Sequence, residues 1–326
     1  MELIKPSIKI WEQGTTLEDM WKHIARCTRV CYQSTPKNDR ETDEEFVKRV
    51  ILKPDSSTGE LNFNKIHGAM LEHGTIYLEI YCYNGCEDDN YYKIINYKEN
   101  KYSIVNNIFY NGESIAKNFA ITTNLRVLYE NNWLDDLKYI CAPTEHHAKR
   151  VTVSFTTNIG VTREFNRHRV NSIAEESTRY CNYNKHNDSQ IKIGLPAWLL
   201  DGDLARLNEF DNGDWLAAIS QIAISQIAES SYDGIGELKY NVDYYGAALY
   251  FCNICYNKLI ERGWKPQQAR EVLPLATKSQ LIHTAFIDDW KHFFALRADG
   301  VSGPPHPNAK LVAEPLKQEF IKRGLL

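Results

Sequence analysis

The sequence predicts an α+β fold, in which helices flank a central antiparallel sheet and a strand-rich segment is inserted. Apolar residues at helical spacing predict helices near both ends of the chain. The longest of these starts at Val242, where apolar residues recur every three or four positions until Gly263. Residues 76–110 instead carry aromatic and β-branched runs separated by Asn, Gly and Asp, which is typical of antiparallel strands. No low-complexity linker divides the chain, so we expect one domain over residues 1–326.

Capping patterns and periodicity locate the elements of the first half. Thr16-x-x-Asp19 and Thr42-x-x-Glu45 each open a helix, because a threonine side chain can accept from the backbone three residues later. The other patterns predict short helices at 66–73, 123–130, 133–140 and 160–169, and strands at 76–81, 91–95, 102–105 and 151–155.

The sequence predicts mostly helices in the second half of the chain. Polar residues 182–190 predict a loop. Thr277-x-x-Gln280 predicts the start of a helix that runs to about Arg297, and the Pro-rich stretch 303–307 then breaks the chain. Further helices are predicted at 215–230, 266–272 and 309–323.

Charge and composition disfavour several classes of function. The net charge is −4, whereas proteins that hold nucleic acid by counterion release carry a basic excess, so we expect no nucleic-acid partner. No apolar run approaches the roughly 18 residues of a membrane helix, and no apolar signal core follows Met1, so we expect a cytoplasmic protein without a membrane partner. The eight cysteines are expected to be reduced, and their spacing predicts no metal site.

The stretch 167–180 concentrates charge in an unusual way, with three arginines, a histidine, two glutamates and several hydroxyl residues. A solvated, salt-bridged helix face would explain the composition alone. Arg270 and Arg297 lie in apolar surroundings and are candidates for buried partners of carboxylates. Converging arginines also suit phosphate recognition, because guanidinium groups bind oxyanions in a planar, forked geometry. The residues by themselves therefore leave open a structural role or an anionic-ligand site for a nucleotide or a flavin.

The order of residues in this stretch resembles the signature of the flavin-dependent thymidylate synthases, R-H-R-x-x-S-x-N-E-x-S-x-R-Y. Ala174 is the one departure, at the position where that family usually has Asn. Four other segments resemble family elements in the same order, namely C-Y-x-S at 31–34, H-x-x-x-L-E-H at 67–73, A-R-x-x-L-P at 269–274 and L-R-x-D at 296–299.

The resemblance implies an activity and a set of partners. Enzymes of that family convert dUMP to dTMP, with methylenetetrahydrofolate as carbon donor, FAD as tightly bound redox carrier and NADPH as reductant. No protein nucleophile is required, because the one-carbon unit passes by way of the reduced flavin. The family's members are homotetramers whose active sites lie between subunits, and the same arrangement is expected here.

Residue roles follow from the resemblance, position by position. Arg297 matches the catalytic arginine that polarises the uracil ring. Ser177 is expected to be a ligand contact and not a nucleophile. The positions implied for dUMP are Glu164, Arg167, Glu175, Glu176, Ser177, Thr178, Arg179, Arg270 and Arg297. The positions implied for FAD are His73, Arg167, His168, Arg169, Glu175 and His292.

Two departures keep other functions open. His73 and Arg167 lie 94 positions apart (167 minus 73), farther than in typical relatives, which implies an insertion at about 80–150. We expect the insertion to form an elaborated surface or an oligomer contact. Together with Ala174, it leaves open a related flavoenzyme that modifies a different pyrimidine nucleotide. A non-catalytic nucleotide-binding protein is a third possibility, which the intact set of arginines disfavours.

Overall fold

A four-stranded antiparallel sheet forms the centre of the protein, as expected for the predicted α+β class. The strands are, in order across the sheet, β2 (Ser7–Trp11), β6 (Arg150–Asn158), β9 (Lys278–Phe286) and β7 (Ser172–Glu175). The computed structural model describes residues 2–34, 36–53, 68–83, 89–108, 116–183, 190–199, 201–209, 212–227 and 240–326.

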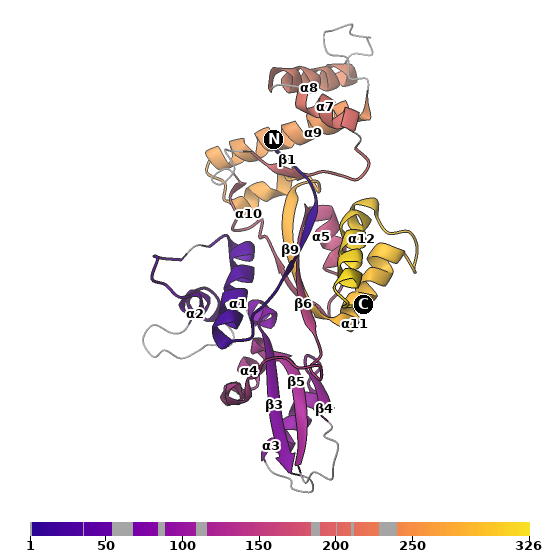
Figure 1. Cartoon of the computed structure of the whole chain (residues 1–326). Coiled ribbons are helices and arrows are strands. Elements are labelled where there is room, and N and C mark those ends of the chain that lie inside the picture. The colour runs from indigo at the N-terminus through magenta and orange to yellow at the C-terminus, as the bar shows by residue number, and fades with distance from the viewer. Residues whose placement is uncertain are drawn as a thin grey trace.

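Helices cover both faces of the central sheet (Figure 1). One face packs against α1 (Leu17–Tyr32) and the short helix η3 (Gly68–His73). The opposite face packs against α5 (Ile159–Phe165), α11 (Ile287–Phe294) and α12 (Pro307–Lys322). Because successive strand residues point to opposite faces, Ile282 of β9 joins the first apolar cluster while Leu281 joins the second.

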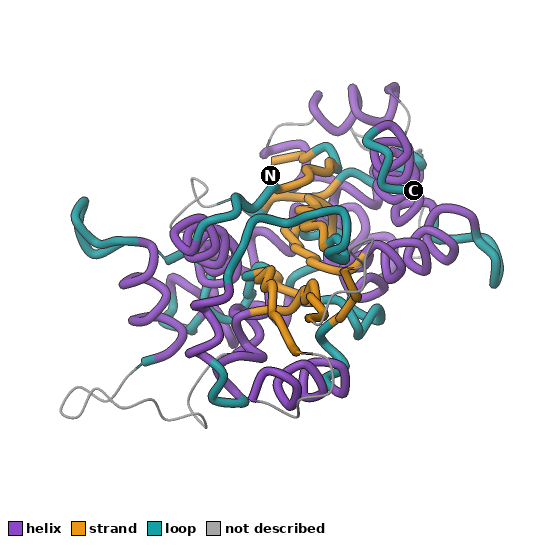
Figure 2. Tube along the Cα trace, turned by 60° about the horizontal axis from the view of Figure 1, so that its bottom comes forward, coloured by secondary structure: helices purple, strands orange, loops and turns teal. Residues whose placement is uncertain are grey.

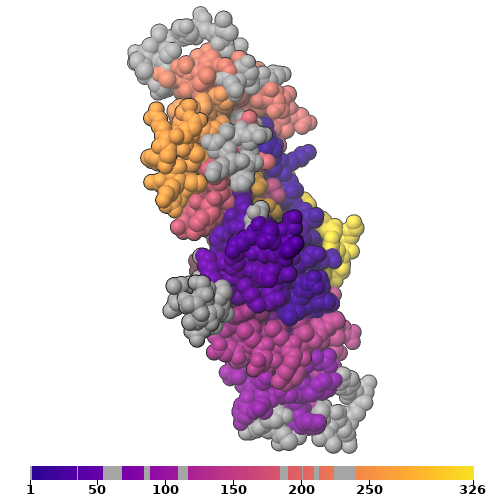
Figure 3. Space-filling model, turned by 90° about the vertical axis from the view of Figure 1, so that its left-hand side faces the viewer, coloured from indigo at the N-terminus to yellow at the C-terminus, as the bar shows by residue number. Residues whose placement is uncertain are grey.

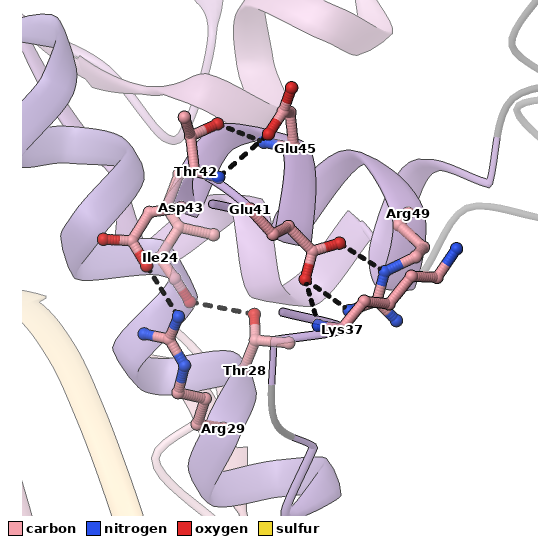
Figure 4. Close-up of polar contacts among 9 residues, drawn as sticks. All are labelled: Ile24, Thr28, Arg29, Lys37, Glu41, Thr42, Asp43, Glu45 and Arg49. Atoms are coloured by element: carbon pink, nitrogen blue, oxygen red, sulfur yellow. Dashed lines mark hydrogen bonds and ion pairs between the residues drawn. The ribbon is translucent and has the colours of Figure 1, made fainter. Parts of the chain in front are cut away.

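Electrostatic and capping contacts tie α1 to the helix that follows it (Figure 4). Helix α2 (Asp43–Val47) begins with a capping box in which Thr42 and Glu45 exchange hydrogen bonds. Arg29 of α1 forms an ion pair of 2.7 Å with Asp43. A π-helical turn, η1 (Lys48–Leu52), continues α2. These contacts fix the C-terminal end of α1, which lies beside the signature stretch.

A second antiparallel sheet extends from one end of the central sheet (Figure 1). Its strand order is β3 (Thr75–Tyr83), β5 (Ala116–Asn124) and β4 (Ile104–Ile108). The same apolar cluster that holds α1 continues into this sheet through Leu78 and Ile121. The helical elements around it are α3 (Asp89–Glu99), α4 (Leu125–Glu130) and the 3₁₀ helix η4 (Leu134–Tyr139).

Helices form the other end of the elongated molecule (Figures 1 and 3). A two-stranded parallel pair of β1 (Glu2–Ile4) and β8 (Lys192–Gly194) connects this layer to the N-terminus. The helices are α7 (Asp201–Glu209), α8 (Asn212–Ile227), α9 (Asn241–Glu261), α10 (Pro266–Ala269) and the short η5 (Arg270–Val272). In the view of Figure 2 the strands run through the middle of the molecule, with helices around them. No helix of the described residues is long and apolar enough to cross a membrane.

Two sequence predictions of secondary structure were wrong. Residues 91–95, predicted as a strand, lie inside helix α3, which buries Ile94 and Tyr97 on one side. Residues 277–297, predicted as one helix, form strand β9, helix α11 and the π-helical turn η6 (Ala295–Asp299). Strand β9 is buried on both faces, so its sequence lacks the alternation that marks a half-exposed strand.

Smaller differences concern element ends. The helix predicted over 160–169 ends at Phe165, and part of the signature stretch becomes strand β7. The helix predicted over 123–130 begins at Leu125, because residues 116–124 belong to β5. Residues 66–67, most of the predicted 182–190 loop and the end of the predicted 215–230 helix lie outside the described residues.

Candidate active site

The second half of the signature stretch lines a pocket of about 520 Å³, which we call the signature pocket. The pocket lies where β7, the end of α1, the start of α5 and the segment around η5 meet. The lining residues are Cys31, Ile159, Arg163, Glu175, Glu176, Ser177, Thr178, Arg179, Arg270, Glu271, Leu273, Pro274 and Leu275. Six of these, Glu175 to Arg179 and Arg270, are residues that the resemblance assigned to dUMP.

Glu176 is held by a dense set of donors beneath the pocket. Its side chain is 6% exposed. One oxygen accepts from Nε2 of Gln33 at 3.0 Å, and the other accepts from Nζ of Lys278 at 2.6 Å and from the backbone N–H of Gln280 at 3.2 Å. These three donors hold the carboxylate in one position. Glu176 therefore connects α1, β9 and the signature stretch.

Glu175 points to the opposite face of the sheet and is fixed there by neutral donors. Nδ2 of Asn166 donates to one carboxylate oxygen at 2.9 Å, and Oγ of Ser279 donates to the other at 3.0 Å. Both donors come from elements that flank the pocket, namely the residues after α5 and strand β9. The carboxylate is thereby held in one orientation while it still lines the pocket.

The arginines of the pocket have weak partners within the chain. Nη1 of Arg270 contacts Oγ1 of Thr178 at 3.4 Å, and its Nε lies 3.6 Å from Glu271, whose side chain is 75% exposed. Arg179 is exposed and lies over the ring of Tyr180, with 5.4 Å from Cζ to the ring centroid. An exposed ion pair contributes little free energy, so these guanidinium groups remain available to an anion.

Arg297 lies in a separate cluster, beside Glu164 of α5. Its Nη1 forms an ion pair of 2.9 Å with Oε2 of Glu164, and its Nη2 donates to the backbone oxygen of Glu164 at 2.8 Å. Its Nε contacts Nε2 of His168 at 3.2 Å. Burial, followed by the charge of Arg297, lowers the pKa of His168 to about 4, so the ring is neutral and accepts this hydrogen bond. Arg297 does not line the signature pocket.

The residues assigned to FAD do not converge on one cavity of a single chain. His73 is fully buried, and its Nδ1 lies 2.8 Å from Oγ1 of Thr284. The ring of His292 contacts that of His168 at 5.8 Å between centroids. Arg167 is exposed, and Arg169 lines another pocket, at the start of the second sheet. Only Glu175 reaches the signature pocket.

Sequence reasoning missed several residues around the site. Arg163 lines the signature pocket and adds a third arginine to it. Gln33 is the variable residue of the C-Y-x-S segment and Lys278 belongs to no motif, and both reach Glu176 only through the fold. Burial, with a contribution from the charge of Glu175, raises the pKa of the Cys31 thiol to about 11, so this thiol is protonated at neutral pH. Cys31 is therefore a wall residue and not an activated nucleophile.

Ala174, which stands where the family usually has Asn, is a residue of the apolar core. Ala174 lies on β7 opposite Ile282 of β9, is 1% exposed and belongs to the apolar cluster that holds α1. An asparagine at this position would place an amide among apolar side chains, away from both the signature pocket and Arg297.

Comparison with known proteins identifies a family. The model of the family described as thymidylate synthase complementing protein matches residues 137–322, more than half of the chain. Among solved structures, the UMP/dUMP methylase PolB from Streptomyces cacaoi bound with 5-Br UMP covers 60% of this chain and 74% of its own, at 21% identity and a TM-score of 0.34. The methylase bound with 5-Br dUMP gives 22% identity and a TM-score of 0.35 over 53% and 66% of the two chains.

No curated protein matches the chain. The low identities and TM-scores of the solved structures add little, so the assignment rests on the family match. That match includes β6, β7, β9 and all residues of the signature pocket except Cys31. The chain therefore belongs to the thymidylate synthase complementing protein family.

Proposed function

We propose that this protein methylates dUMP to dTMP. The observation that carries the proposal is the signature pocket, in which five consecutive signature residues and Arg270 line one cavity of about 520 Å³. A volume of this size suits a mononucleotide, since ligand pockets generally span about 300–1,000 Å³. The family assignment supports the same substrate.

The pocket offers separate groups for the parts of a nucleotide. Arg163, Arg179 and Arg270 supply guanidinium donors to a phosphate. The hydroxyls of Ser177 and Thr178 add neutral donors beside them. Glu175, held by Asn166 and Ser279, supplies a fixed acceptor for a sugar hydroxyl or a base N–H. The substrate contacts assigned to Glu164, Arg167 and Arg297 would come from outside this lining.

We assign the catalytic role to Arg297. A fixed guanidinium near a uracil ring stabilises the negative charge that develops when the ring is activated at C5. Glu164 and His168 hold the Arg297 guanidinium in a fixed orientation, which is the preorganisation that such a role needs. Since Arg297 and the signature pocket are separate within one chain, we propose that the complete site lies between subunits of a homotetramer.

The proposed co-substrates are methylenetetrahydrofolate as carbon donor and NADPH as reductant, with FAD as bound cofactor. When bound, FAD supplies the redox chemistry and carries the one-carbon unit. The donor set fits its phosphates in part, because Arg167 and Arg169 are exposed cations next to the neutral ring of His168. His73 is fully buried and does not line the signature pocket, so its assigned contact with FAD would need a rearrangement of the residues around it.

We further propose that residues 1–326 form one catalytic domain with an insertion at about 80–150. The continuous apolar cluster between α1 and the second sheet supports this division, because a separate domain would have its own core. In the structure, the second sheet begins earlier than the proposed insertion, at Thr75.

A turnover assay tests the function. Purified protein is supplied with dUMP, methylenetetrahydrofolate, FAD and NADPH, and each is omitted in turn. dTMP should form only in the complete mixture, and NADPH should bleach the flavin of the protein under anaerobic conditions. Parallel reactions with UMP and dCMP identify the nucleotide that is accepted. Tight binding of FAD and dUMP without any dTMP would contradict the proposal.

A further inference from the structure

A second pocket lies where the second sheet meets the central sheet, and we call it the junction pocket. Its volume is about 340 Å³. Its lining residues are Lys101, Tyr102, Asn124, Arg150, Arg169, Val170, Ser172, Ala285, Phe286 and Asp289. Lys101, Tyr102 and Asn124 belong to the second sheet and its connections, outside the segment that the family model matches. The pocket therefore combines residues of the matched segment with residues of the second sheet and its connections, which lie outside that segment.

Arg150 is the central cation of the junction pocket. Its Nη1 donates to the backbone oxygen of Glu72 and to Oγ1 of Thr75, both at 3.1 Å, and its Nη2 donates to Oγ of Ser172 at 3.0 Å. All three acceptors are neutral, and among the described residues no carboxylate forms an ion pair with this guanidinium. Its Nε is buried and has no acceptor among the described residues.

This arrangement makes the charged form of Arg150 less favourable. Loss of hydration lowers the pKa of the guanidinium to about 10, although Tyr77, Glu72 and Asp289 act in the opposite direction. A cation that gives up water without a paired anion is destabilised unless a ligand supplies the charge. The ring of Phe286, 5.4 Å from Cζ of Arg150, holds the guanidinium in place.

Two more cations border the same pocket. Lys101 is exposed, and its Nζ lies 4.8 Å from the ring centroid of Tyr102. Arg169, of the signature stretch, is also exposed. Among the described lining residues Asp289 alone carries a carboxylate, and burial is the main cause that raises its pKa. The lining thus carries three cations against one carboxylate that burial disfavours in its charged form.

We propose that the junction pocket binds the pyrophosphate group of a dinucleotide cofactor, and that Lys101 and Tyr102, in the turn that leads into β4, complete it. A pyrophosphate complements the charge excess, and Tyr102 and Ser172 supply hydroxyl groups beside the cations. FAD and NADPH both carry this group. The inference rests on the proposed function for the choice of cofactors, but the anion site itself rests on the lining residues. The second sheet and its connections then serve cofactor binding.

Calorimetric titration of the full chain with inorganic pyrophosphate tests the site. Wild-type protein should bind pyrophosphate, and Lys101→Ala should weaken binding about tenfold, the loss of one charge-assisted hydrogen bond. Lys101→Arg should restore most of the affinity. Lys117→Ala is the matched control, because Lys117 is an exposed cation of the same sheet outside the pocket and should leave binding unchanged.

Competition identifies the cofactor. Saturation with FAD should abolish pyrophosphate binding if the flavin occupies the pocket, and saturation with NADPH should do so if the reductant does. Equal pyrophosphate affinities in wild type, Lys101→Ala and Lys117→Ala would overturn the inference, as would the absence of competition from both cofactors. A wild type that makes no dTMP but shows these differences would overturn the proposed function alone.

Discussion

The carboxylate of Glu164 lies 2.9 Å from Nη1 of Arg297, and the backbone oxygen of Glu164 accepts a second hydrogen bond from Nη2 of Arg297. With His168 bound to Nε, every nitrogen of the guanidinium has a partner inside the chain. The guanidinium of Arg297 is therefore held in one orientation, and its positive charge is partly neutralised. Glu164 contributes to both effects, since its two oxygens bind the guanidinium and its carboxylate carries the opposite charge.

Two substitutions separate these effects. Arg297→Ala should lower kcat on the order of 10²-fold or more, because a preorganised charge is removed from the reacting ring. Glu164→Gln should change kcat less than about tenfold, since the backbone acceptor and the side-chain shape remain. Steady-state kinetics with dUMP measures both, with Arg323→Ala at the C-terminal end of α12 as control. A near-normal kcat in Arg297→Ala would remove it from the catalytic role.

Arg270 should act on substrate affinity. Among the described residues its close partners are Thr178 at 3.4 Å and the exposed Glu271, so its charge is available to the phosphate of the proposed dUMP substrate. Arg270→Ala should weaken dUMP binding by about 10- to 150-fold, the value of one charge-assisted contact of roughly 1.5–3 kcal/mol. Equilibrium dialysis with dUMP measures the change, and Arg262→Ala, at the exposed end of α9, should bind normally. Unchanged affinity in Arg270→Ala would place the phosphate elsewhere.

The pair of Glu176 and Lys278 should dominate stability near the pocket. The two side chains are 5% and 18% exposed. Lys278→Met should cost about 3 kcal/mol of unfolding free energy, because it leaves a buried carboxylate without its cation. Adding Glu176→Gln to the same chain should recover much of that loss. Urea denaturation of the two single variants and the double variant at pH 7.5 gives the coupling energy, and additive losses would show that the pair contributes little.

Ala174→Asn should restore the usual residue of the family signature at a cost in stability. The new amide would lie in the apolar cluster without a partner, and about 1–3 kcal/mol of unfolding free energy should be lost. Val170→Asn is the control, because Val170 is 62% exposed and should tolerate an amide. Urea denaturation compares the two. Equal stability of both variants would show that the cluster can accommodate an amide.

Stability should fall as the pH drops below 6.5. Burial lowers the pKa of His23 and His168 to about 4 and that of His283 to about 3 from the ordinary 6.5, and it also lowers that of His73. Between about pH 4 and 6.5 the unfolded chain binds protons at these rings and the folded chain does not. Each ring therefore removes about 1.4 kcal/mol of unfolding free energy per pH unit below 6.5.

Urea midpoints between pH 7.5 and 5 measure this slope. His23→Asn should reduce the slope by about one proton, although it also loses the contact with Thr152. His146→Asn changes a ring that is 38% exposed and is the control. A slope that is identical in all three proteins would show that buried His23 does not contribute.

The sequence predicted the α+β class and singled out six of the residues that line the signature pocket, because both depend on local order. Six assigned residues share that pocket, and five of them are consecutive. Arg297 is different, since its partner Glu164 lies 133 positions away and no local pattern announces the pair. Helix α3 was missed for a similar reason. Tyr97 and Lys93 both bind Asp136, and this tertiary contact outweighs the strand preference of the Tyr- and Ile-rich run.

Strand β9 has a consequence for how the length of the chain can vary. Lys278 and the backbone of Gln280 serve Glu176 on one face, and Ser279 between them serves Glu175 on the other. Inserting or deleting a single residue here would exchange the faces and remove both carboxylates from their donors at once. The turn at 300–306 carries no such alternation. We therefore expect insertions and deletions among relatives to occur in that turn and not in residues 278–284.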